Sequence, residues 1–171
     1  MEEDRKVTNQ AELERLQHMP NTSMKPAPGM RVRLVARCPG NAADVLRKCK
    51  EVLVLVLQQD VNNWPSIDEW RSLLPSWFVR QSEEEVSSEK AEQRLRLSLE
   101  ERIELSKKWS VSAFVYWFQP NDRYWFWWDA TAETASSVSV TVMVEDLPFP
   151  WGALEWLLRT AGAASVELLE S

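Results

Sequence analysis

The sequence predicts an α+β fold in which an antiparallel or mixed sheet of about four strands carries helices on one side. Residues 31–38 and 138–144 alternate between apolar and polar side chains, a pattern typical of half-buried strands. Residues 41–49 and 151–161 instead carry apolar side chains at helical spacing. The order strand, helix, further helices, two strands, helix, strand resembles a split β-α-β arrangement. A ferredoxin-like sheet with a helical insertion is one topology that fits this order.

Length, composition and net charge limit the number of domains and the classes of partner. The 171 residues fit one ordinary domain, and the 44% that are hydrophobic suffice for a sizeable core. The formal net charge is −6, and acids and bases are mixed along the chain, which argues against nucleic-acid binding. We expect an N-terminal extension at 1–29 and a single α+β domain at 30–171, with a helical insertion at about 64–108.

The N-terminal extension is predicted to contain a short helix and a linker. Asn9 and Glu12 have the spacing of a capping box, and the helix that they start should end before Pro20. The segment 21–29 contains two prolines and a glycine, which is typical of a linker.

A strand and a helix follow the linker. Residues 31–38 place apolar side chains on one side and three arginines on the other, and Asn41 can cap the helix that comes next. For residues 51–58 the sequence leaves two structures open. The β-branched residues there favour a strand, whereas the absence of glycine and proline favours continuation of the helix, which we prefer.

The insertion is predicted to be helical throughout. Ser66 and Glu69 form a second capping box for a short helix. The charged segment 82–108 fits one amphipathic helix or two helices broken at Ser98, where Ser98 and Glu101 have the same box spacing.

The most unusual stretch is residues 116–128, where eight of thirteen residues are aromatic and a turn at 120–122 divides the segment. Residues 111–118 fit a short helix capped by Ser110, with a strand as the competing structure. Residues 124–131 are predicted to be a strand with rings on both faces.

Both faces of that strand have to be covered in a soluble protein, because each buried ring removes on the order of 150–250 Å² from water. We expect the helices to cover one face and the inserted helices to cover the other, which would carry Trp125 and Trp127. A loop of moderate length should lead into the strand at 138–144. A helix at 151–161, closed by Gly162, and a last strand at 165–169 complete the prediction.

The sequence lacks the residue patterns of familiar catalytic centres. His18 is the only histidine, and Cys38 and Cys49 are the only cysteines, expected as free, buried thiols. One histidine and two distant cysteines are too few for an imidazole-based triad or a zinc cluster. The four glycines are too scattered for a glycine-rich loop that binds phosphate. We therefore predict no catalytic residue, no metal site and no cofactor.

The remaining candidates for contact with a ligand or partner lie around the aromatic strand. Asp122 is a natural turn residue and Asp129 closes a strand, but paired acids beside tryptophans also occur in sugar-cleaving sites. Arg123 fits a salt bridge at the rim or an anion contact. The tryptophans have three interpretations: core packing, a protein-binding patch, or a stacking platform. The residues assigned to contact are Trp125, Trp127, Arg123, Asp122 and Asp129.

Three segments carry a resemblance to a known family: LPSWF at 74–78, YWFWWDA at 124–130 and PFPWGALEWLLRTAGA at 148–163. They are similar to small tryptophan-rich bacterial proteins to which no activity is assigned. The resemblance covers scattered blocks of about residues 64–164, and it implies neither a function nor a catalytic residue.

The sequence as a whole favours a non-enzymatic protein-binding domain whose partner is another protein. An immunity-like or antitoxin-like inhibitor is the specific form that analogy suggests. The alternative is a small-molecule or carbohydrate binding protein, or a hydrolase that uses Asp122, Asp129 or Glu145 in a tryptophan-lined pocket. The charged N-terminus and the short apolar run at 52–57 argue against a secretory signal and a membrane span, so we expect a cytoplasmic protein. The oligomeric state stays open.

Overall fold

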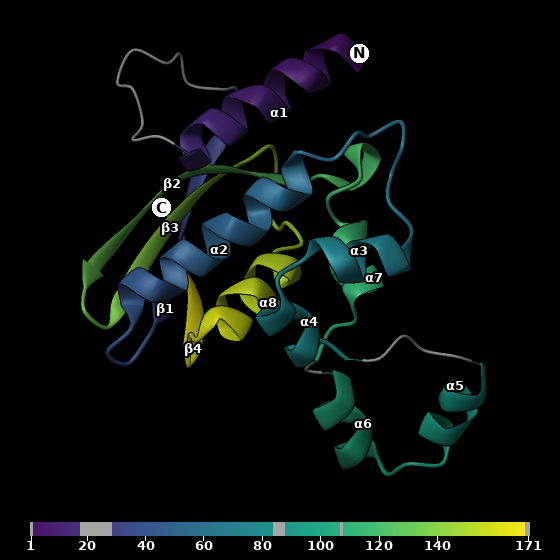
Figure 1. The fold of residues 1–171 in the computed structure, drawn as a ribbon. Coiled ribbons are helices and arrows are strands. Elements are labelled where there is room, and N and C mark those ends of the chain that lie inside the picture. Colours follow the sequence, from purple (N-terminus) through teal and green to yellow (C-terminus); the bar gives the residue numbers. More distant parts are fainter. Residues whose placement is uncertain (1, 18–28, 84–87, 107, 170–171) are drawn as a thin grey trace.

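The fold is α+β, as predicted, and is built on one four-stranded antiparallel sheet (Figure 1). The structure is a computed structural model that describes residues 2–17, 29–83, 88–106 and 108–169. Its elements, in chain order, are α1 (Glu2–Gln17), β1 (Met30–Arg37), α2 (Ala42–Leu57), α3 (Ile67–Leu73), α4 (Ser76–Gln81), α5 (Ser88–Leu95), α6 (Leu99–Ser106), α7 (Val111–Tyr116), the 3₁₀ turn η1 (Pro120–Asp122), β2 (Trp125–Thr134), β3 (Ser137–Val144), α8 (Gly152–Ala161) and β4 (Ser165–Leu169).

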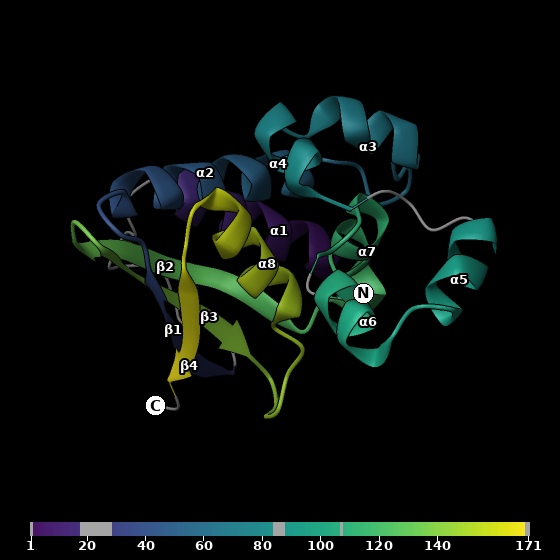
Figure 2. The same ribbon diagram turned by 90° about the horizontal axis from the view of Figure 1, so that it is seen from below.

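The strands lie in the order β2-β3-β1-β4, and each adjacent pair is antiparallel. Helices α2 and α8 pack against each other and lie on the same side of the sheet (Figure 2). This order is compatible with a ferredoxin-like arrangement, which stays a prediction. The β2–β3 hairpin is tighter than expected, because Thr134 pairs with Ser137 and leaves a two-residue turn where we expected a loop of moderate length.

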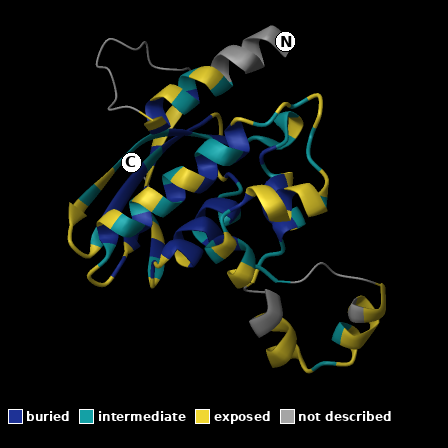
Figure 3. Ribbon diagram, viewed as in Figure 1, coloured by how far each residue is buried: buried dark blue, intermediate teal, exposed yellow. Residues whose placement is uncertain are grey.

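One face of the sheet packs against the hydrophobic core. Its side chains come from alternate residues of the strands, and register places Trp127 of β2 and Val32 of β1 on either side of Val142 of β3. Figure 3 shows that buried residues gather where α2 and α8 meet the sheet, whereas α5 and α6 stand away from it and are largely exposed. The core therefore lies mainly between the sheet and these two helices, and buried residues of α1, α3, α4 and α7 extend it, among them Leu16, Trp70, Phe78 and Phe114.

Trp125 and Trp127 lie on the core face of the sheet, and the prediction that placed them on the opposite face is wrong. Both side chains point to the same face as the buried residues of β1 and β3, and not to a separate face that the inserted helices cover. The helices packed on β2 are α1 and α2. The other face carries Phe126 and Trp128, both only half-buried. A bulge at Trp128 shifts the register between Trp127 and Asp129.

Most local predictions in the helical part are confirmed. Residues 51–57 continue α2, so the helix is the correct alternative for that segment. Ser66 and Glu69 form the predicted capping box, and Ser110 accepts a hydrogen bond from the backbone N–H of Ala113 at the start of α7. The charged segment is two helices, with Ser98 and Glu101 exchanging hydrogen bonds of 3.1 and 3.2 Å at the break.

Helix α1 differs from the prediction in length and packs on the body of the molecule. It begins at Glu2, well before Asn9, and contacts both α2 and β2. Leu16 is buried in the core, and Glu12 and Arg15 are buried polar residues. His18 and most of the predicted linker at 21–29 lie outside the described residues.

Candidate functional site

Two of the five residues assigned to contact lie in the core. Trp125 is 3% exposed and Trp127 is fully buried. Trp125 packs edge-on against the ring of Phe118, with 5.7 Å between ring centroids. Neither indole therefore presents a surface to a partner, and the core-packing interpretation describes both of them.

Arg123 forms a buried ion pair, in contrast to the salt bridge expected at the rim. Its Nη2 donates to Oε1 of Glu12 at 2.7 Å, with the two side chains only 5% and 1% exposed. The guanidinium also donates to the backbone oxygen of Trp125. Because Glu12 neutralises Arg123, this arginine contributes little net charge to its surroundings.

The two aspartates lie in different places. Asp122 accepts a hydrogen bond of 3.3 Å from the hydroxyl of Tyr116, and the negative charge of Asp122 raises the pKa of that phenol. Asp129 accepts from the N–H of Ala130 and lines a hollow of about 450 Å³ with Trp128 and Arg33 on the far face of the sheet. The structure therefore does not bring Asp122 and Asp129 together.

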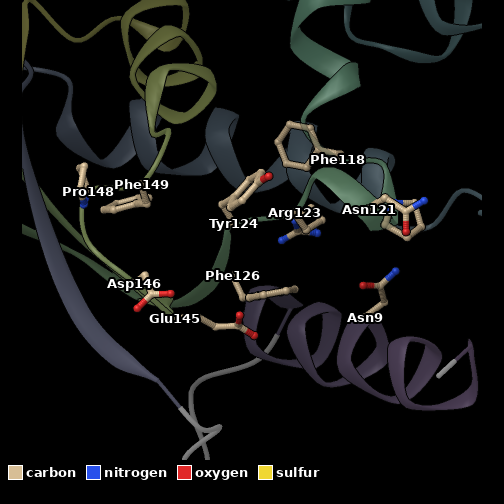
Figure 4. A pocket seen from close by; sticks show the side chains of 11 residues that line it. Asn9, Phe118, Asn121, Arg123, Tyr124, Phe126, Glu145, Asp146, Pro148 and Phe149 are labelled. Atoms are coloured by element: carbon tan, nitrogen blue, oxygen red, sulfur yellow. The ribbon is translucent and has the colours of Figure 1, made fainter.

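A larger pocket of about 530 Å³ lies between α1, the segment that enters β2 and the loop between β3 and α8 (Figure 4). Its volume is within the range of about 300–1,000 Å³ typical of ligand sites. It is lined by Asn9, Phe118, Pro120, Asn121, Arg123, Tyr124, Phe126, Glu145, Asp146, Pro148 and Phe149. Four aromatic rings and two carboxylates are thus brought to one cavity from two parts of the chain, and Asn9 of α1 adds a third.

The two carboxylates of this pocket have no ion-pair partner among the described residues, whereas its arginine has one. Glu145 and Asp146 are exposed, and neither forms an ion pair or hydrogen bond with any residue in the described part of the chain. Arg123, on the same wall, is already paired with Glu12. The pocket therefore has a net negative charge.

Sequence reasoning singled out Arg123 and Glu145 but missed most of the pocket. Asn9 comes from the N-terminal helix and Phe149 follows β3, so no sequence motif connects them. The acidic pair at the end of β3, followed by two prolines, was the one local signal of an exposed loop.

A surface of exposed aromatic residues adjoins the pocket. Tyr116 is 47% exposed and Tyr124 is 51% exposed, and both rings contact the ring of Trp117 between them. We call these three residues the tyrosine face. All seventeen aromatic residues of the chain lie in its described part, and Tyr116 and Tyr124 are the only exposed ones among them.

A second exposed apolar surface lies away from the pocket. Leu95 of α5 and Leu99 and Ile103 of α6 are exposed on the two helices that project from the body (Figure 1). This leucine patch contains no aromatic ring and lines none of the described pockets.

Both cysteines are free and buried, as predicted. Burial raises the pKa of both thiols, which lowers the thiolate fraction at neutral pH. We expect Cys49 to react with iodoacetamide at least about a hundredfold more slowly in the folded protein than in about 6 M guanidinium chloride. Mass spectrometry of timed samples measures both rates, and fast labelling of the folded protein would contradict the burial of this thiol.

The part of the chain that the structure describes contains neither a group of metal-binding side chains nor a membrane-spanning helix. No group of three or more His, Cys, Asp or Glu residues there could hold a metal ion. None of the helices described there is long and apolar enough to cross a membrane.

Comparison with family models, curated proteins and solved structures finds no match for this chain. The resemblance to small tryptophan-rich proteins therefore stays a prediction.

Proposed function

We propose that this chain is a protein-binding domain whose contact surface is the tyrosine face together with the pocket beside it. The observation that carries the proposal is the exposure of Tyr116 and Tyr124 in a chain that otherwise covers its aromatic residues. Tyrosine is enriched among the residues that dominate binding energy at protein interfaces, because its ring is rigid and its hydroxyl can stay hydrated. A concave site next to such rings is the usual place for an anchoring side chain.

The specific form of the proposal is a bacterial, cytoplasmic inhibitor of the immunity or antitoxin kind. Small size, an acidic composition and an α+β fold support this form by analogy. Binding to a partner protein requires no catalytic residue, cofactor or metal.

Of the alternative functions, the pocket supports binding of a small molecule or carbohydrate, but not hydrolysis. The hydrolase alternative uses Asp122, Asp129 or Glu145, and of these three carboxylates only Glu145 lines the main pocket. Asp129 lines the hollow on the other face. The volume of the main pocket suits a small molecule as well as a side chain, so small-ligand binding is the rival outcome of the experiments below.

The proposal is tested by affinity capture from the native host with matched surface variants. A chain with Tyr116→Ala and Tyr124→Ala is expected to bind the captured protein at least about tenfold more weakly than the natural chain. The control with Leu95→Ala and Leu99→Ala removes apolar side chains of the leucine patch that are even more exposed than the two tyrosines, and it should bind normally. Titration of the purified partner by calorimetry gives the affinities. Loss of binding in the leucine variant with normal binding in the tyrosine variant would contradict the proposal.

A further inference from the structure

We infer that the pocket beside the tyrosine face accepts a positively charged side chain, lysine or arginine, of the partner protein. This inference deepens the proposed function and rests on it, because it names the chemistry by which the partner is recognised at the same site.

The walls of the pocket suit a cation. Figure 4 shows Tyr124, Phe126 and Phe149 around one cavity, and aromatic rings attract cations through the negative potential of their faces. The molecule already uses its rings in this way, since the guanidinium carbon of Arg123 lies 4.7 Å from the ring centroid of Phe126 and 5.4 Å from that of Phe118. No cation in the described part of the chain lies over Tyr124 or Phe149.

The charges of the pocket select the same kind of ligand. Glu145 and Asp146 lie at one end of the cavity, both exposed and both without an ion-pair partner among the described residues (Figure 4). The positive charge of Arg123 is balanced by Glu12 at 2.7 Å. An incoming cation therefore meets two uncompensated carboxylates, and the net charge of −6 steers a basic partner toward the chain.

A side chain of a protein fits this site better than a free amine. The pocket shares Tyr124 with the tyrosine face, so a polypeptide lying across Tyr116 and Tyr124 passes the mouth of the cavity. Lysine and arginine carry their charge on a long apolar stem, which can pack on the rings while the charged end reaches the carboxylates.

The test compares acetylated, amidated pentapeptides of alanine with arginine, lysine, norleucine or glutamate at the centre. Binding to the 171-residue chain is followed by amide chemical shifts. We expect saturable shifts at Tyr124, Glu145 and Phe149 with the arginine and lysine peptides. The norleucine and glutamate peptides should bind at least about tenfold more weakly, because they lack the positive charge. Raising the sodium chloride concentration from about 50 mM to about 500 mM should lower the affinity for the arginine peptide, because salt screens the charges of exposed carboxylates.

Matched variants assign the effect to the pocket. The double variant Glu145→Gln and Asp146→Asn should bind the arginine peptide about tenfold more weakly. A control with Glu133→Gln and Glu167→Gln removes the same charge from exposed positions that do not line the pocket and should bind normally. All of these substitutions are at exposed sites, and a thermal unfolding curve checks that each variant is folded.

The outcomes separate this inference from the proposed function. Equal binding of the norleucine and arginine peptides, or an unchanged affinity of the Glu145→Gln, Asp146→Asn variant, would overturn the inference even if the tyrosine face captures a partner. Tighter binding of tetramethylammonium than of either basic peptide would also overturn it, because the natural ligand would then be a small amine. Selective binding of the basic peptides supports the inference, and failure of partner capture would then count against the proposed function alone.

Discussion

A chain that begins at Met30 is expected to lose most of its folding stability, because helix α1 supplies buried residues and covers the outer edge of β2. Leu16 is buried in the core, and its burial contributes about 1.5–3 kcal/mol. Glu12 and Arg15 bind the backbone N–H and oxygen of Trp127 at 2.7 and 3.1 Å. Removing α1 also breaks the ion pair between Glu12 and Arg123, and each hydrogen bond that involves a charged group contributes about 1.5–3 kcal/mol.

The combined loss is comparable with the total stability of about 5–15 kcal/mol that ordinary domains have. Urea unfolding followed by tryptophan fluorescence should show a truncated chain that is largely unfolded in buffer. A chain that begins at Asn9 is the control. It keeps Glu12, Arg15 and Leu16, and Asn9 can cap the shortened helix, so we expect its free energy of unfolding within about 1 kcal/mol of the full chain. Equal stability of all three chains would show that α1 does not hold β2.

Glu12→Ala is expected to lower the free energy of unfolding by about 3–5 kcal/mol. The substitution leaves the guanidinium of Arg123 in a buried place without a counter-charge, and it removes the acceptor of the Trp127 backbone N–H. An unpaired buried donor adds about 1–3 kcal/mol to such a loss. Chemical denaturation of the natural and variant chains measures the difference.

Two variants check the cause of that loss. Glu155→Ala breaks an exposed pair with Arg159 and should cost no more than about 1 kcal/mol. The double variant Glu12→Met and Arg123→Met removes both charges together and should be less destabilised than Glu12→Ala, because the buried charge of Arg123 is removed with its partner. If the double variant is the less stable of the two, the cost of Glu12→Ala does not come from the charge of Arg123.

Several helix starts and two of the strands could be predicted because these features depend on near neighbours. Capping contacts join residues three apart, which is why Ser66, Ser98 and Ser110 marked helix starts correctly. Alternation with a period of two likewise identified β1 and β3. The helical structure of 51–57 was less certain, since β-branched residues there oppose the helix and only packing decides.

The candidate site could be predicted only in fragments. The sequence drew attention to Arg123 and Glu145, which both line the pocket, but it did not show that Phe149 and Asn9 complete the cavity. It also assigned contact to Trp125 and Trp127, whose rings are buried. The tyrosines next to them are exposed, and a row of aromatic residues in a sequence does not show which of its members reach the surface.

By itself, the sequence determined the α+β class, most of the helices and strands and the abundance of aromatic residues, because these properties follow from composition and from contacts within a few residues. The tertiary structure alone decided that Glu12 pairs with Arg123, that Trp127 faces the core and that Tyr124 faces solvent beside a pocket. Glu12 and Arg123 meet only when a helix from one end of the chain packs against a strand near the other end. Such long-range packing depends on the shapes and charges of whole surfaces, and no local spacing of residues encodes it.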